Sequence, residues 1–92
     1  MKDETLLTAL EETARKLSIQ LDYDDLKRGA VDSQGGLFTL KGEKRMLVHK
    51  GLSPRERVRV LTELLSVQDI ERVHIPIEVR ELLEGEREKS RQ

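Results

Sequence analysis

The stretch 35–51 constrains the fold of this chain more than any other part of the sequence. Two short apolar runs, 37–40 and 45–49, lie on either side of Lys41-Gly42-Glu43-Lys44, and Gly42 supplies the unusual backbone angles of a tight turn. This pattern predicts a β-hairpin. The apolar side chains expected to share one face of it are Phe38, Leu40, Met46 and Val48.

The hydrophobic period changes once before the hairpin. Residues 3–17 place leucine and alanine at helical spacing, which predicts an amphipathic helix. Residues 19–23 then alternate apolar and polar side chains, which indicates a short half-buried strand. The stretch 27–34 contains Gly29 and Asp32 and is predicted to be a loop.

A second helix has a clear start signal after the hairpin. Ser53 can accept a hydrogen bond from the backbone N–H of Glu56, whose carboxylate can bond back to Ser53. Pro54 occupies the first helical position, where its missing N–H costs nothing. The buried stripe continues to about Ser66. A last helix follows and is expected to end at Gly85, because glycine commonly succeeds the final turn of a helix.

These elements predict an α+β fold with an N-terminal helix, a small three-stranded and mainly antiparallel sheet containing a β-hairpin, and two C-terminal helices. The chain of 92 residues is long enough for one domain with a thin core. We expect residues 1–85 to form that single domain. Residues 86–92 are all polar, and we expect them to be a disordered tail.

The composition argues against several classes of protein. Tyr23 and Phe38 are the only aromatic residues, which counts against a single-strand nucleic-acid reader built on exposed rings. There is no cysteine, which excludes disulfides, thiolate chemistry and cysteine-based zinc sites. No apolar stretch approaches the length of a membrane span, and residues 1–5 lack the features of a signal peptide. A cytoplasmic location is therefore expected.

No pattern predicts a catalytic, cofactor-binding or metal-binding residue. A metal site needs converging ligands, whereas His49 and His74 fall in different predicted segments. The acidic cluster 22–25 lacks the spacing of a calcium loop and is expected to serve in a turn. The serines lie outside any G-x-S-x-G motif, and Gly35-Gly36 does not open a phosphate-binding loop.

Most of the chain, Leu17 to Leu83, resembles a group of small bacterial proteins whose function is not known. The resemblance is carried by the opening Gly35-Gly36-Leu37, by the hairpin turning at Gly42, and by the closing run I-P-I-E-V-R-E-L-L at 75–83. It implies no particular chemistry.

A more distant resemblance is to the minimal zincin scaffold of ImmA/IrrE-type metallopeptidases. It is carried by the order of elements from Asp3 to Ser66 and by the helix entry Leu52-Ser53-Pro54. That resemblance implies a helix with H-E-x-x-H, whose two histidines hold zinc from one helical face. This chain has Thr62-Glu63-Leu64-Leu65-Ser66 there, so we expect the zinc site to be absent.

Positive charge is concentrated around the hairpin and the start of the second helix, although the net charge of the chain is −1. Between residues 41 and 59 the only acidic residues are Glu43 and Glu56, so this region is a candidate interaction surface. Its basic residues are Lys41, Lys44, Arg45, Lys50, Arg55, Arg57 and Arg59.

These patterns favour a non-catalytic protein–protein interaction module that uses the hairpin and the following helix, with a second copy of the chain among its candidate partners. The physical reason is that a thin core and open sheet edges invite further burial. The apolar residues expected to contribute are Leu47, Leu52, Val60 and Val67. Two alternatives stay open: a weak nucleic-acid-binding protein that uses the basic residues, and a remnant metallopeptidase. No membrane partner, small-molecule substrate or cofactor is indicated.

Overall fold

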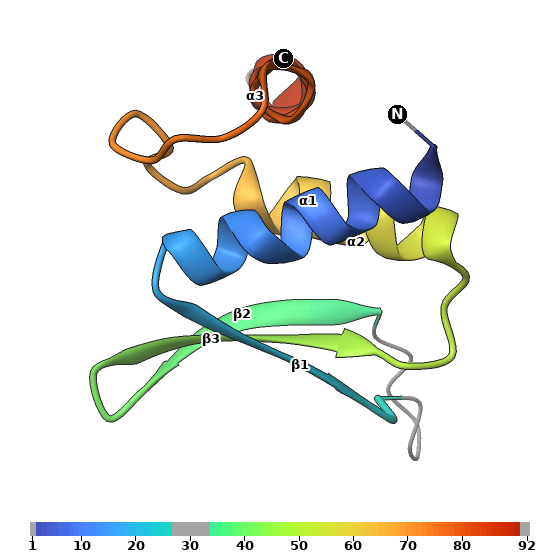
Figure 1. The fold of residues 1–92 in the computed structure, drawn as a ribbon. Coiled ribbons are helices and arrows are strands. Elements are labelled where there is room, and N and C mark those ends of the chain that lie inside the picture. Colours follow the sequence, from blue (N-terminus) through green and yellow to red (C-terminus); the bar gives the residue numbers. More distant parts are fainter. Residues whose placement is uncertain (1, 27–33, 91–92) are drawn as a thin grey trace.

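The computed structural model describes residues 2–26 and 34–90, and Figure 1 shows their arrangement. Most of the predicted loop at 27–34 lies outside the described residues. The elements, in chain order, are α1 (Asp3–Lys16), β1 (Ile19–Asp24), β2 (Gly35–Leu40), β3 (Glu43–His49), α2 (Pro54–Leu65) and α3 (Ile77–Ser90). The predicted α+β fold and the predicted order of helices and strands are confirmed.

The sheet of the described chain has three strands in the order β1-β3-β2. The hairpin strands β2 and β3 pair antiparallel, as predicted, and Leu40 lies opposite Glu43. β1 pairs with the other side of β3 in parallel, with Ile19 opposite Lys44. The sheet is therefore mixed, and β3 is its central strand.

The turn of the hairpin has two residues, Lys41 and Gly42. Both have positive φ angles, 51° and 81°, as a type I′ turn requires. This turn matches the right-handed twist of the flanking strands, so β3 begins at Glu43, two residues earlier than the apolar pattern alone predicts.

The helices form layers on one side of the sheet (Figure 1). α1 and α2 lie across one face of the sheet, and α3, seen end-on, lies on the far side of α1 and α2. Within the described chain, α3 contacts both helices and none of the strands. α2 approaches β2 closely because Gly35 has no side chain: a Cβ there would lie 3.0 Å from Cγ1 of Val60.

The core lies between the sheet and the helices and extends up to α3. It is aliphatic, and its side chains come from all three helices, from β1 and β3, and from the β3–α2 and α2–α3 connections. The largest fully buried apolar residues are Leu10, Met46, Val48, Leu61, Leu65, Ile70, Val79 and Leu83. Burial of such side chains against one another is what positions the helices on the sheet.

The predicted start of α2 is confirmed. The Ser53 hydroxyl accepts a hydrogen bond from the backbone N–H of Glu56 at 3.2 Å, and the Glu56 carboxylate accepts one from the backbone N–H of Ser53 at 3.0 Å. Pro54 is the first helical residue. This capping box satisfies two of the N–H groups that a helix start leaves without partners.

The end of α3 differs from the prediction. The helix passes through Gly85 and continues to Ser90, so the expected helix end at Gly85 and the expected disordered tail are wrong for residues 86–90. Arg87 supplies the physical reason, because its guanidinium donates hydrogen bonds to the backbone carbonyls of Ser66 and Gln68, at 2.9 and 2.7 Å. These contacts tie the last turns of α3 to the end of α2.

Candidate functional site

The two faces of the sheet differ in what covers them. Met46 lies opposite Leu37 in the hairpin, and this pair faces α1 and α2, because Met46 is fully buried. Phe38 lies opposite Arg45, so it points to the other face, where 41% of its surface is exposed. Leu40 lies on that face too and is 47% exposed.

The prediction that Phe38 and Leu40 share a face with Met46 and Val48 is therefore wrong. Residues directly opposite each other in an antiparallel pair have side chains on the same face. A turn of two residues, like any turn of even length, places Leu40 opposite an odd-numbered residue. The even-numbered residues of β2 and of β3 consequently point to opposite faces.

We call the uncovered side of the sheet the open face, because no described helix lies over it (Figure 1). The register of the three strands gives its members, which are Gln20, Asp22, Asp24, Gly36, Phe38, Leu40, Glu43, Arg45, Leu47 and the buried His49. The apolar members come from the hairpin, whereas the aspartates come from β1. The open face is thus apolar along one side and acidic along the other.

Arg45 lies between these two halves of the open face. Its guanidinium forms an ion pair with Glu43 at 3.3 Å, and its side chain is 30% exposed. Its Nε atom is buried and has no hydrogen-bond partner among the described residues. A buried N–H group usually has an acceptor, so the Nε of Arg45 has hydrogen-bonding capacity that the described residues do not use.

The structure distributes the seven predicted basic residues over separate places rather than on one patch. Lys41 and Lys44 lie at the turn end of the hairpin, whereas Lys50 follows the opposite end of β3 (Figure 1). Lys44 donates a hydrogen bond to the side chain of Gln68 at 3.1 Å. Arg55 lies exposed on the first turn of α2.

Two of the basic side chains in α2 bind within the chain. Arg59 donates a hydrogen bond to the side-chain oxygen of Gln34 at 3.1 Å. Arg57 donates to the carbonyl oxygens of Lys50 and Leu52, at 2.6 and 3.1 Å, and so holds the connection between β3 and α2. A guanidinium fixed in this way has fewer donors left for an outside ligand.

Arg57 also lies over the ring of Tyr23, 4.5 Å from its centroid. The Tyr23 hydroxyl donates a hydrogen bond to the carboxylate of Glu11 at 2.5 Å. Burial raises the pKa of Tyr23, and the hydrogen bond and negative charge of Glu11 raise it further, while Arg57 lowers it. The phenol is therefore neutral at physiological pH, and it joins β1 to α1 and α2.

The two histidines have separate structural roles. His49 is buried, and its Nδ1 accepts a hydrogen bond from the backbone N–H of Leu26 at 3.2 Å. His74 is exposed in the α2–α3 connection, and its backbone carbonyl accepts a hydrogen bond from Nζ of Lys16 at 2.5 Å. Among the described residues, no group of three or more histidine, aspartate or glutamate side chains is placed to hold a metal ion.

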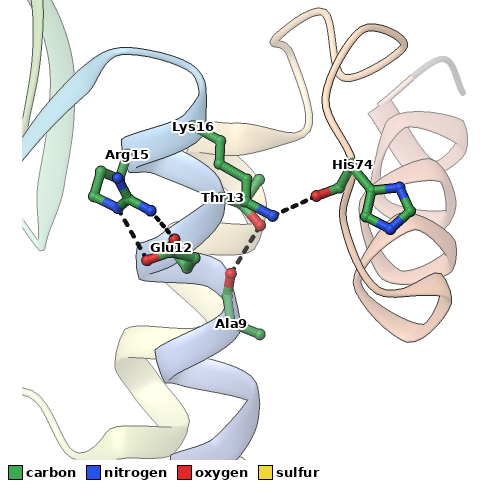
Figure 2. A network of polar contacts seen from close by, with 6 residues as sticks. All are labelled: Ala9, Glu12, Thr13, Arg15, Lys16 and His74. Carbon is green, nitrogen blue, oxygen red and sulfur yellow. Dashed lines mark hydrogen bonds and ion pairs between the residues drawn. The ribbon is translucent and has the colours of Figure 1, made fainter.

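Figure 2 shows the surroundings of this Lys16 contact. Lys16 reaches from the end of α1 to the backbone of His74, and the imidazole ring takes no part. The other polar contacts drawn are internal to α1: Arg15 pairs with Glu12, and the Thr13 hydroxyl donates to the carbonyl of Ala9 at 2.8 Å. The Lys16 contact anchors the connection that leads to α3.

The α2 positions where the zincin resemblance implies ligands face the core. Thr62 and Ser66 are buried, and their hydroxyls donate to carbonyls of their own helix, Val58 at 2.6 Å and Glu63 at 2.8 Å. The Glu63 side chain is exposed. This side of α2 packs against other elements, and Thr62 also borders a hollow at the surface.

A hollow lies between the first residue of α1, α2 and the end of α3. Its ionisable residues are three acids and three bases, so it has no single sign of charge with which to attract an ionic ligand. The lining residues are Asp3, Arg55, Glu56, Val58, Arg59, Thr62, Leu82, Glu86 and Lys89. Of these side chains, Thr62 and Glu56 bond to the backbone of α2 and its cap, and Arg59 bonds to Gln34, so the open face remains the stronger candidate site.

Searches against protein-family models, curated proteins and solved structures each return no significant match. No described helix has the length and apolar character needed to cross a bilayer. The open face must therefore be interpreted from its own residues.

Of the open-face residues, sequence reasoning assigned only Arg45 and Leu47 to an interaction surface and did not recognise the face itself. Leu47 was expected to invite further burial, and it is half-buried on the open face. Leu52 and Val60, expected in the same role, are core residues. Val67 is 70% exposed but lies outside the sheet. The signal that could have revealed the face is the even length of the turn.

Proposed function

We propose that this protein is a non-catalytic protein–protein interaction module and that the open face of its sheet is the contact surface. The observation that carries the proposal is the asymmetry of the sheet, which has two helices on one face and exposed Phe38 and Leu40 on the other. Exposed apolar side chains that adjoin on a flat sheet mark interaction sites more often than isolated ones do.

The energies involved suit a modest interface. Complete burial of a leucine or phenylalanine side chain contributes about 1.5–3 kcal/mol, and Phe38 and Leu40 are already about half-buried. Covering both would therefore add roughly 2–3 kcal/mol. The remaining binding free energy would have to come from backbone pairing at a sheet edge or from an acceptor for the Nε of Arg45.

The alternatives receive less support from the same observations. A nucleic-acid interface needs several phosphate contacts from one surface, whereas the basic residues here lie at both ends of the sheet and four of them bind within the chain. A metallopeptidase needs ligands on α2, whose corresponding residues Thr62 and Ser66 are buried. The cytoplasmic location stays a prediction from the sequence.

The substitution Leu40→Lys tests the proposal. It places a charge in the apolar half of the open face, next to Phe38 and without touching the core, so binding of any protein partner should weaken about tenfold or more. Val67→Lys is the matched control, because Val67 is exposed but lies outside the sheet. Complexes would be captured by chemical cross-linking and quantified for the wild type and both variants, after circular dichroism has confirmed folding. Equal capture by the two lysine variants would contradict the proposal.

A further inference from the structure

The strand β2 is an edge of the sheet, because the strand order is β1-β3-β2. The carbonyl of Gln34 accepts a hydrogen bond from the backbone N–H of His49 at 2.8 Å. Since bonding alternates along an antiparallel pair, the even-numbered residues of β2 bond to β3. The backbone N–H and C=O of Leu37 and Thr39 therefore point outward, and no described group bonds to them.

This edge lacks the protection that sheet edges usually have. From Gly35 to Leu40 the strand contains no charged residue and no proline, whereas the opposite edge, β1, carries Asp22 and Asp24. Two copies of β1 placed side by side would bring these carboxylates together, which is unfavourable. Two copies of β2 bring no like charges together within the strand, so the charge pattern selects β2 as the edge for self-pairing.

Symmetry restricts how two copies of β2 can pair. A two-fold axis perpendicular to the sheet makes the strands antiparallel and keeps both open faces on the same side. Residues opposite each other must then share a face, and the bonding groups must be those of Leu37 and Thr39. Gly35 already takes part in another interaction. The register that avoids both Gly35 and the turn residue Lys41 as partners of Leu37 and Thr39 pairs Leu37 with Thr39 of the second copy, and it sets Phe38 opposite Phe38 of that copy.

We propose that the chain forms a symmetric dimer in which β2 pairs with β2 of a second copy in this register, giving one continuous six-stranded sheet. The proposal rests on the proposed function and specifies its partner. Two pairs of backbone hydrogen bonds form between Leu37 and Thr39 of the two copies, and the Phe38 rings pack against each other across the axis. The two open faces join into a single surface with Phe38 at its centre.

The register predicts a specific cross-link. The sequence has no cysteine, so any disulfide that forms must join the introduced cysteines. Opposed residues at a non-hydrogen-bonded position have Cα atoms about 4.5 Å apart, within the range of a disulfide. Phe38→Cys should therefore form a disulfide-linked dimer on mild oxidation. In the Leu40→Cys variant, the cysteine of one copy lies opposite residue 36 of the second copy, four residues along the strand from the second cysteine. This separation is about 13 Å, which a disulfide cannot span.

The measurement is the rate of dimer formation on non-reducing gels at equal protein concentration. Phe38→Cys should cross-link at least about tenfold faster than Leu40→Cys, which is equally exposed on the same strand. Equal rates, or no cross-linked Phe38→Cys dimer, would overturn the inference.

A second pair of variants tests the backbone bonds directly. Thr39→Pro removes an N–H that points outward, so the bonds from β2 to β3 stay intact, whereas Thr39→Val keeps that N–H. Light scattering coupled to gel filtration should give a dimer mass for the wild type and Thr39→Val and a monomer mass for Thr39→Pro. A wild-type monomer at the highest concentration, or a Thr39→Pro dimer, would refute the β2–β2 pairing.

If the wild type is a monomer but other proteins still bind it in a Leu40-dependent way, the proposed function stands without self-pairing.

Discussion

At the scale of single residues, the two adjacent glycines of β2 differ in whether the structure leaves room for a side chain. A Cβ on Gly35 would lie 2.8 Å from the carbonyl oxygen of Leu47 and 3.0 Å from Cγ1 of Val60. A Cβ on Gly36 would meet nothing within 4 Å, because this residue points to the open face. Gly35 is thus a packing requirement for α2, whereas Gly36 is not.

Substitution of each glycine by alanine should separate these roles. Gly35→Ala forces β2 and α2 apart and should lower the free energy of unfolding by about 1–3 kcal/mol. Gly36→Ala should change it by no more than about 0.5 kcal/mol. Urea unfolding followed by circular dichroism measures both. Similar losses in the two variants would mean that α2 does not pack on β2 as described.

At the scale of elements, the start of α2 and the hairpin were predictable because their signals are local. Ser53, Pro54 and Glu56 act within one helical turn, and Gly42 acts within the hairpin loop, so neighbouring residues alone determine the outcome. The end of α3 was not predictable in this way. Gly85 suggests a helix end, but distant carbonyls bound by Arg87 continue the helix.

Gly85 offers a direct test of this explanation. In a helix interior, glycine is less favourable than alanine by about 0.8–1 kcal/mol, and a Cβ at Gly85 would meet nothing within 4 Å. Gly85→Ala should therefore raise the free energy of unfolding by about that amount, measured by thermal or urea unfolding. If Gly85 instead ends the helix in a left-handed conformation, as its sequence context predicts, alanine would lower the stability.

The same distinction between local and distant signals applies to the candidate site. The residues of the open face come from three strands, and their common orientation depends on the register between those strands. The parallel pairing of β1 with β3 brings together residues about 25 positions apart, such as Ile19 and Lys44, and has no local sequence signal. Likewise, the basic residues adjoin in the sequence, but β3 separates Lys44 from Lys50 in space.

At the scale of the whole molecule, Tyr23 connects three elements through Glu11 and Arg57. Tyr23→Phe removes the hydrogen bond to Glu11, which should cost about 0.5–1.5 kcal/mol of stability at neutral pH. Because the fold raises the pKa of Tyr23, this contribution is complete below the unfolded pKa of about 10 and is lost as the pH rises through the folded pKa.

The wild type and Tyr23→Phe should therefore become more similar in stability as the pH rises above about 10. Urea unfolding of both proteins between neutral and strongly alkaline pH measures this difference. Lysine titration affects both proteins alike, so the difference isolates Tyr23, which is the only tyrosine. A difference that stays constant over the alkaline range would show that the Tyr23 hydroxyl does not bond to Glu11.

The central position of β3 also has a consequence for synthesis of the chain. β1 has no strand neighbour other than β3 in the described sheet, and Ile19 meets Lys44, which is made 25 residues later. At 5–20 residues per second, a ribosome needs roughly one to five seconds to cover that distance. During this interval the nascent β1 has no β3 to pair with. α1, which is made just before β1, is the element against which the apolar side chains of β1 can pack.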